Sequence, residues 1–295
     1  MKNNYEQFSL RWQYNAGSGS LVWQLMFTQT GDLIGQKRVA ASRRSLFFCL
    51  DTVTGKVFLD DYLLMNHFSS DTAINTETGI AGEGWFTGLE TTSKHLGYCY
   101  ACQPQSPEHK GIWAIDFRTG RGVWARPDIG FIANLNDRFL VSHSSVFGGF
   151  PERQFLLVDP LTGCDLSLSG LDSAQVNAIR EEAVPEEVRQ KVTLPEVVTE
   201  GMTKERRALR RLGFDETVGC ECIFKGRLVV VAVHEQDKLQ GTWHSFLEVW
   251  YKGRPVYADA LEKGVDTPGF NNFLMHGDNL FYIKGKDKLL CVALS

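Results

Sequence analysis

One short turn occurs three times in this chain and constrains its fold. It has the pattern Asp-x-x-Thr-Gly and lies at Asp51–Gly55, Asp116–Gly120 and Asp159–Gly163, each time between two apolar runs. The aspartate can accept a hydrogen bond from the backbone two residues on, and the glycine supplies the positive φ that closes a short hairpin. A hairpin that recurs at intervals of tens of residues is typical of a repeat architecture. An all-strand repeat predicts an all-β fold of the β-propeller type.

A fourth copy of the repeat has lost its aspartate and threonine. Residues Gly253 to Tyr257 parallel Gly120 to Trp124, since Gly-Arg-x-Val is followed by an aromatic residue in both. Two more short apolar segments, joined by a tight polar turn, precede each turn. Each repeat is therefore expected to be a four-stranded blade. The segment pairs are 21–27 with 33–40, 85–91 with 96–102, 131–135 with 139–143, and 218–224 with 228–234.

The C-terminal segments 273–276, 280–284 and 289–294 begin a fifth repeat that lacks a fourth strand. The N-terminal segment Phe8–Trp12 is a strand without a neighbour of its own. We expect it to pair with 289–294, because closing the ring removes an open sheet edge. The chain is thus predicted to be a single domain, residues 1–295, with five four-stranded blades closed by the N-terminal strand.

One segment, residues 171–213, departs from the strand pattern. Its residues favour helix, Asp172 and Thr203 are suitable N-caps, and Gly213 is a suitable C-terminal cap. We interpret it as a helical insertion between the third and fourth blades. It is expected to lie over the face of the propeller that carries the long loops, either as a lid above a ligand or as a brace.

The repeat resembles that of the quinoprotein-type (PQQ-like) propellers, whose blades also combine an apolar strand, an Asp-x-x-Thr-Gly turn and a strand with an aromatic residue near its end, here Trp124. The redox enzymes of that superfamily hold their cofactor with adjacent cysteines and metal-binding acids. This chain has no adjacent cysteine pair. The resemblance therefore implies the propeller fold without a quinone cofactor, and a relationship to intracellular bacterial propellers of unknown function.

Composition limits the classes of partner. A net charge of −4 argues against broad binding to nucleic acid or to an anionic membrane. Residues 1–16 have no apolar core of the kind found in signal peptides, and the longest apolar run, Leu228–Val233, is too short to cross a bilayer. The seven cysteines are best read as reduced thiols. We expect a cytoplasmic protein of bacterial type.

Three motifs could carry chemistry, and each has a plainer explanation. Cys99 and Cys102 are spaced as in metal sites but fall on a predicted strand, so buried structural cysteines are favoured. The glycine-rich stretch 79–84 precedes a strand, whereas a phosphate-binding loop opens a helix. The basic segment 203–212 could grip an anion, but pairing with the acids of residues 181–187 is favoured. No cofactor and no metal ion are predicted.

The most useful grouping follows from propeller geometry. The Asp-x-x-Thr-Gly turns lie on one face of such a fold, and nearly every long loop then falls on the other, which marks a candidate binding face. His143 and His234 both end the second strand of a blade, in adjacent blades. The candidate ligand-binding residues are Arg44, Asp128, His143, His234 and Asp266. Other polar residues expected on this face are Arg43, His109, Arg126, Arg153, Glu235 and Asp237.

Two classes of function fit this pattern. The first, which we favour, is a binding or scaffolding module that holds a small polar ligand or a protein partner on the long-looped face. The alternative is a hydrolase or lyase acting on a sugar-like substrate in the central funnel. Glycoside chemistry would need two carboxylates about 5–10 Å apart, and Asp128 and Asp266 are the nearest candidates.

Overall fold

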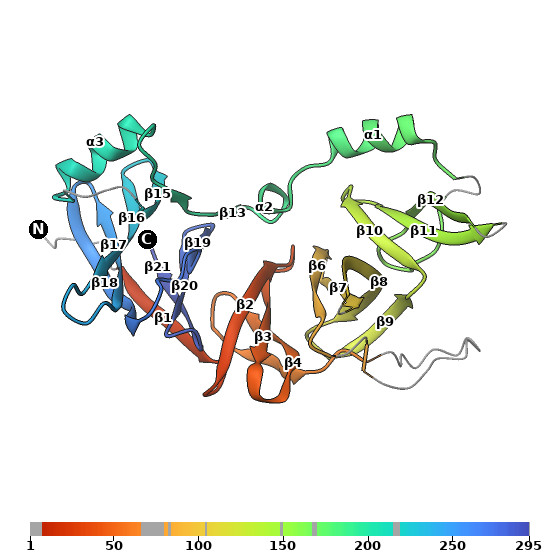
Figure 1. Ribbon diagram of the computed structural model, residues 1–295, viewed down its shortest axis with the longest axis horizontal. Helices are drawn as coiled ribbons and strands as arrows, with labels where there is room; N and C mark the ends of the chain where they lie inside the picture. The colour runs from red at the N-terminus through yellow and green to blue at the C-terminus, as the bar shows by residue number, and fades with distance from the viewer. Residues whose placement is uncertain are drawn as a thin grey trace, which may run out of the picture. The chain divides into compact units, whose positions relative to one another are not determined.

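The computed structural model describes residues 8–65, 80–81, 84–103, 105–147, 150–166, 170–214 and 219–294. The fold is all-β, with only a few short helices (Figure 1). The chain forms two compact units, each of which is described by itself. Unit 1 comprises Met1–Ser18 and Lys191–Ser295, and unit 2 comprises Gly19–Gln190. The glycine-rich stretch 79–84 falls mostly outside the described residues.

The described residues of unit 2 form three antiparallel sheets in which neighbouring strands follow one another along the chain. The short helix η1 (Ala40–Ser42) joins two strands of the first sheet. That sheet consists of β2 (Ser20–Phe27), β3 (Asp32–Val39), β4 (Arg44–Asp51) and β5 (Val57–Tyr62). The second consists of β6 (Thr87–Ser93), β7 (Leu96–Gln103), β8 (Ser106–Asp116) and β9 (Arg121–Arg126). The third consists of β10 (Ile129–Asn134), β11 (Phe139–Phe147) and β12 (Phe150–Val158).

In unit 1, the part of the chain that the structure describes forms two antiparallel sheets of five strands each. Both include a two-residue strand at one edge, contributed by the segment that was predicted to be helical. The order in one sheet is β14 (Glu196–Val197), β15 (Glu221–Lys225), β16 (Leu228–Gln236), β17 (Trp243–Tyr251) and β18 (Arg254–Val265). The order in the other is β1 (Ser9–Asn15), β21 (Lys288–Ala293), β20 (Asn279–Lys284), β19 (Phe273–His276) and β13 (Val192–Thr193).

The three repeated turns have the predicted conformation. The carboxylate of Asp51 accepts hydrogen bonds from the backbone N–H groups of Val53 and Thr54, at 3.0 and 2.7 Å. The carboxylate of Asp159 holds its own turn in the same way. The closing glycines have φ values of 70°, 73° and 72°, so the glycine is required by the backbone at each turn.

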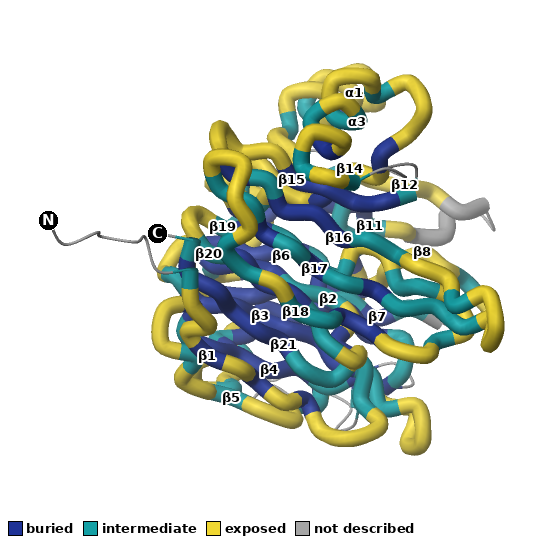
Figure 2. The backbone as a smooth tube through the Cα atoms, turned by 90° about the vertical axis from the view of Figure 1, so that its left-hand side faces the viewer, coloured by how far each residue is buried: buried dark blue, intermediate teal, exposed yellow. Residues whose placement is uncertain are grey.

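The sheets bury their apolar residues against one another in layers. Within unit 2, one cluster packs the first sheet on the second, and another, which contains Tyr98 and Phe139, packs the second on the third. The ring centroids of Tyr98 and Phe139 lie 4.7 Å apart, and the two ring planes are inclined at 87°. Within unit 1, a third cluster lies between the two sheets. Figure 2 shows the result, since long stretches of strands such as β3 and β4 are buried while the turns are exposed.

The N-terminal strand pairs as the sequence predicts. β1 lies antiparallel to β21, with Trp12 opposite Cys291 and Tyr14 opposite Leu289. Trp12 and Tyr14 are both buried, and Phe8 packs on the core of unit 1. β21 thus has a neighbour on each side, β20 and β1.

The third sheet has three strands in the described residues, and the segment after Gly163 that was predicted to form the fourth includes residues 167–169, which lie outside them. Its last turn, Asp159–Gly163, is followed in the described residues by two isolated bridges, Val158 to Asp165 and Phe155 to Leu171.

The insertion, residues 171–213, is helical only in part. It forms α1 (Ser173–Glu182), α2 (Glu186–Arg189) and α3 (Thr203–Arg211), with β13 and β14 between them. The two short strands form because the extended backbone there completes the edges of existing sheets, at β19 and β15. In unit 1, α3 packs on its sheet through Leu209, which is fully buried.

Helix α2 is anchored in unit 2 by a buried hydrogen-bond network. Arg189, whose side chain is only 4% exposed, donates to Glu186 of the same helix and to the Thr91 hydroxyl of β6 at 3.0 Å. Gln190 accepts the backbone N–H of Phe27 at 2.8 Å. Asn134 of β10 donates to Thr91 at 2.8 Å. The network therefore links α2 to all three sheets of unit 2, which makes this helix a brace.

None of the helices in the described residues is long and apolar enough to span a membrane.

Candidate functional site

The five predicted ligand-binding residues fall into separate environments. Arg44, Asp128 and His143 belong to unit 2, and His234 and Asp266 belong to unit 1. Arg44 is exposed at the start of β4, and Asp266 is exposed just after β18. Within unit 2, Asp128 and His143 are in direct contact.

Asp128 and His143 form an ionic cluster at the junction of the second and third sheets. Arg126, the last residue of β9, donates to Asp128 at 2.9 and 2.8 Å and to Asp165 at 2.9 Å. The Nδ1 atom of His143 lies 3.2 Å from the Asp128 carbonyl oxygen and 3.4 Å from its carboxylate. The side chains of Arg126, Asp128 and His143 are 25%, 40% and 33% exposed.

The electrostatics of this cluster limit its chemistry. Burial raises the pKa of Asp128, but the hydrogen bonds and charge of Arg126 outweigh burial and hold that pKa below its ordinary value of 3.8. Because Asp128 is ionised at neutral pH, it cannot serve as a general acid there. Arg126, shared between two carboxylates, has no free charge to offer a ligand.

His234 lies in a buried polar row in unit 1. Its Nδ1 atom is 2.8 Å from the hydroxyl of Ser245, and its Nε2 atom is 3.6 Å from a carboxylate oxygen of Glu221. Ser245 and Glu221 are both fully buried. His234 and Ser245 are direct partners across β16 and β17, and Glu262 is the partner of Ser245 on β18.

The row holds the connection between β18 and β19. Glu262 accepts the backbone N–H of Gly269 at 2.9 Å, and Glu221 accepts that of Asn271 at 2.7 Å. Between these two bonds, the ring of Phe270 lies 4.8 Å from the imidazole of His234. Since Ser245 is fully buried, it is not placed to attack a substrate. The contacts of His234 therefore position a loop and do not form a nucleophilic site.

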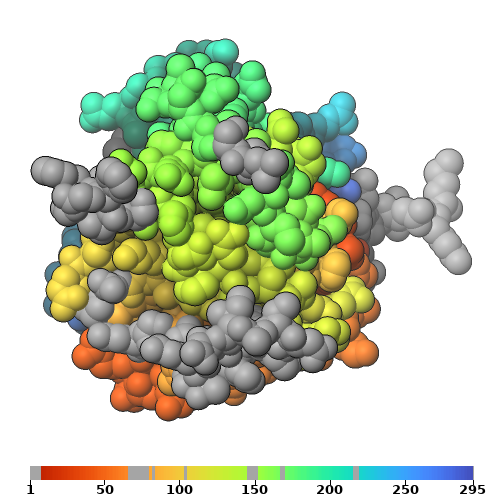
Figure 3. All heavy atoms as spheres, turned by 90° about the vertical axis from the view of Figure 1, so that its right-hand side faces the viewer, coloured from red at the N-terminus to blue at the C-terminus, as the bar shows by residue number. Residues whose placement is uncertain are grey.

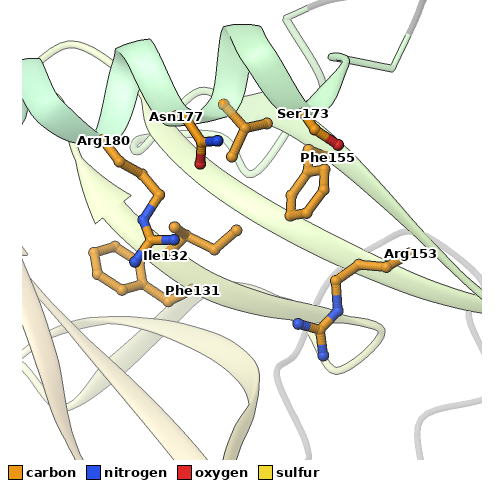
Figure 4. Close-up of a pocket in the computed structure, with 8 residues that line it drawn as sticks. Phe131, Ile132, Arg153, Phe155, Ser173, Asn177 and Arg180 are labelled. Carbon is orange, nitrogen blue, oxygen red and sulfur yellow. The ribbon is translucent and has the colours of Figure 1, made fainter.

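A pocket of about 450 Å³ lies in unit 2 between α1 and the third sheet. Figure 3 shows α1, in green, against the yellow-green strands of this sheet. The floor is apolar and includes Phe131, Ile132 and Phe155, while the helix contributes Ser173, Asn177 and Arg180. In Figure 4, Arg180 reaches down from α1 toward Phe131, and Arg153 lies on the other side of the pocket.

Local sequence features place this helix. Asp172 accepts the backbone N–H of Gln175 at 2.8 Å, and Gln175 accepts that of Asp172 at 2.9 Å, which forms a capping box at the start of α1. Val176 is buried and faces the sheet. Just before the helix, the backbone N–H of Leu171 donates to the carbonyl of Phe155 at 2.9 Å and fixes α1 to β12. The roof of the pocket is therefore tied to its floor.

Among the described residues, the pocket is lined by two arginines and by no acid. Arg153 pairs with Glu108 at 2.6 Å, and both side chains are about half exposed. Arg180 makes no ion pair within the part of the chain that the structure describes. Two arginines above an apolar floor suit a ligand that carries an anionic group on an apolar or flat body.

Sequence reasoning named Arg153 as a residue of the long-looped face but missed Arg180, Asn177, Phe131 and Phe155. The capping signal at Asp172 could have indicated that an ordered helix starts there. The bulge at Ile132, where the register with β11 shifts between Phe131 and Ala133, has no sequence signature.

None of the seven cysteines, all of which lie among the described residues, forms a disulfide bond. Cys99 is buried, and burial raises the pKa of its thiol well above the ordinary value. Cys102 donates to the carbonyl of Phe86. Among the described residues, no group of three or more histidine, cysteine, aspartate and glutamate side chains is arranged to hold a metal ion.

No protein-family model and no curated protein sequence matches this chain. Among solved structures, it is similar to the Dos1 propeller, with 11% identity, a TM-score of 0.26, and 94% of this chain and 55% of that one covered. The chain thus spans about half the length of that protein. It is also similar to MPT-4, a mannose phosphorylase from Leishmania mexicana, with 8% identity, a TM-score of 0.27 and coverages of 94% and 85%. It is similar as well to a thermostable family-43 glycoside hydrolase, with 10% identity, a TM-score of 0.26, and 94% of this chain and 90% of that one covered. Similarities this low carry no argument about function.

Proposed function

We propose that the protein is a binding module that holds a small anionic ligand in the pocket between α1 and the third sheet. The observation that carries this proposal is the pair of arginines, Arg153 and Arg180, on either side of an apolar floor. Arginine suits the task because its planar guanidinium group can donate two parallel hydrogen bonds to a carboxylate or a phosphate. The rings of Phe131 and Phe155 give the ligand's apolar part a surface to pack against.

The architecture that we propose around this pocket is a single five-bladed β-propeller closed by the N-terminal strand. Its support is the order of the five described sheets along the chain, the three repeated turns and the addition of β1 to the last sheet. The resemblance to quinoprotein-type repeats belongs to the same proposal. Cysteines that form no disulfide bond fit a reducing compartment such as the cytoplasm.

The alternative, a glycosidase that uses Asp128 and Asp266, has less support. A glycosidase needs one protonated carboxylic acid beside the leaving group and one ionised carboxylate, and because Arg126 keeps Asp128 ionised, only Asp266 of this pair could be the acid. Asp128 is also committed to Arg126 and His143. A binding function needs no such acid.

The proposal is tested with compounds that carry a flat ring, either with an oxyanion or without one. Phenyl phosphate and benzoate are expected to raise the thermal unfolding temperature, whereas phenol and benzamide are not. The double variant Arg153→Gln, Arg180→Gln should weaken binding of the anions by at least about tenfold, since each charged hydrogen bond contributes about 1.5–3 kcal/mol. Its own unfolding temperature should change little because both side chains are exposed.

The exposed arginine of β9, Arg121, supplies the matched control. Arg121→Gln removes one positive charge from unit 2 but leaves the pocket unchanged. Comparison of the phosphate with the carboxylate then shows which oxyanion the pocket prefers. Binding that is equal for the neutral compounds, or that survives the double variant, would rule out the proposed pocket, as would a failure of both anions to bind.

A further inference from the structure

A second group of aromatic and charged side chains lies in unit 2, away from α1. Its centre is Arg38 of β3, whose guanidinium carbon lies 4.3 Å from the ring centroid of Trp23 and 5.2 Å from that of Trp85. An arginine between two indoles is held by cation–π attraction and by stacking. We call Trp23, Arg38 and Trp85 the tryptophan–arginine cluster.

The backbone conformation at each tryptophan is fixed by a specific feature of the fold, a bulge at Trp23 and a hydrogen bond at Trp85. β2 bulges at Trp23, where its register with β3 shifts between Val22 and Gln24, and a bulge redirects the side chain of the extra residue. The carbonyl of Trp85 accepts a hydrogen bond from the Ser45 hydroxyl at 3.1 Å, and Gln36 donates to that hydroxyl at 3.0 Å. Ser45 and Gln36 are buried. The backbone of Trp85 is therefore held in place by buried side chains.

Arg38 differs from the other arginines that unit 2 holds in place. Arg118 donates to Asp32, Arg126 to Asp128, and Arg189 to Glu186. Arg38, by contrast, has no carboxylate partner among the residues that the structure describes, and its Nε atom is buried without a hydrogen-bond partner. A guanidinium group that is already immobilised loses little conformational entropy when it binds a carboxylate.

Glu90, an acid whose charge acts on the same tyrosine as that of Arg38, already has a hydrogen-bond partner of its own. Burial and Glu90 raise the pKa of Tyr100, and the charge of Arg38 opposes that rise. The carboxylate of Glu90 is taken by His109, at 2.7 Å, and the imidazole of His109 stacks on Tyr100. Two more arginines, Arg43 and Arg44, are exposed just beyond the end of β3.

The cluster is open to solvent on one side, because Trp23 is 55% exposed. Tryptophan and arginine are the residue types that most often dominate the energy of protein–protein interfaces. We propose that the tryptophan–arginine cluster docks an acidic segment of a partner protein. An aspartate or glutamate carboxylate of that segment accepts hydrogen bonds from Arg38, and an apolar residue next to it packs on Trp23.

The test is a selection of displayed random short peptides against the full chain. The selected peptides are expected to share an aspartate or glutamate beside an apolar or aromatic residue. Synthetic copies should bind Arg38→Gln at least about tenfold more weakly, since a hydrogen bond to a charged group contributes about 1.5–3 kcal/mol. Trp23→Ala should also weaken them, and Arg38→Lys should restore only part of the affinity because it lacks the planar fork.

Arg121→Gln is again the matched control and should bind the peptides as the unmodified protein does. Circular dichroism of each variant shows whether it is folded; if Trp23→Ala is not, Trp23→Phe takes its place. Selected peptides without an acid, peptides whose affinity survives Arg38→Gln, or equal binding of copies with asparagine or glutamine in place of the acid would each overturn the proposal. The double variant Arg153→Gln, Arg180→Gln should bind these peptides normally, which separates this site from the pocket.

Discussion

Removal of residues 1–14 is expected to destabilise the protein by about 4 kcal/mol or more, the range found when a buried Trp or Phe side chain is truncated. The deletion removes nearly all of β1 and with it Trp12 and Tyr14, which are 8% and 5% exposed. It also leaves β21 as an open sheet edge, which favours aggregation. Equilibrium unfolding in urea measures the loss, and gel filtration detects the association.

The control is removal of residues 1–7 only, which precede β1 and leave Phe8 in place. That shorter deletion should unfold at nearly the same urea concentration as the full chain. Unchanged stability after the longer deletion would contradict the role of β1 in completing its sheet.

The second large effect is expected for Arg189→Ala. The side chain of Arg189 is 4% exposed and donates to Glu186, to Thr91 at 3.0 Å and to Thr92 at 3.4 Å. Its removal takes one donor from each of these acceptors and weakens the attachment of α2 to β6, although Glu186 and Thr91 keep other hydrogen bonds. Breaking a buried ion pair by deleting one partner costs about 3–5 kcal/mol. Because Glu186 is 29% exposed and water can replace part of the loss, about 3 kcal/mol is expected.

Arg180→Ala is the matched control, since it removes an arginine from the neighbouring helix at an exposed position. It should change the free energy of unfolding by less than about 0.5 kcal/mol. If the two variants are equally stable, α2 is not a brace, and residues 183–190 only connect α1 to the rest of the chain.

The parts of the fold that could be predicted are those set by local chemistry. The Asp-x-x-Thr-Gly turns depend on one side chain and one glycine within five residues, so their conformation follows from the sequence alone. The strands around them follow from alternation of apolar residues. The unpaired segment at the N-terminus needed a partner, and β21 was the one strand predicted to lack a neighbour.

The candidate site was harder to predict because it depends on contacts between distant residues. The position of α1 over β12 is fixed by Leu171 and Val176, and nothing near Arg180 in the sequence indicates that it faces Phe131. His234 was identified as a candidate, but its partners Ser245 and Glu221 follow only from the register of β15, β16 and β17. The short strands β13 and β14 form because sheet edges were available, a tertiary effect that residue propensities do not contain.

The central claim is that the space beneath α1 is where the ligand binds, and filling that space tests it most directly. Asn177 lines the pocket, whereas Ala174 is exposed on the same helix and does not line it. Titration calorimetry with phenyl phosphate or benzoate, whichever binds the unmodified protein more tightly, should show that Asn177→Trp weakens binding by at least about tenfold, or 1.4 kcal/mol. Ala174→Trp, which adds the same indole outside the pocket, should bind as the unmodified protein does. Equal affinity in Asn177→Trp and the unmodified protein would contradict the account.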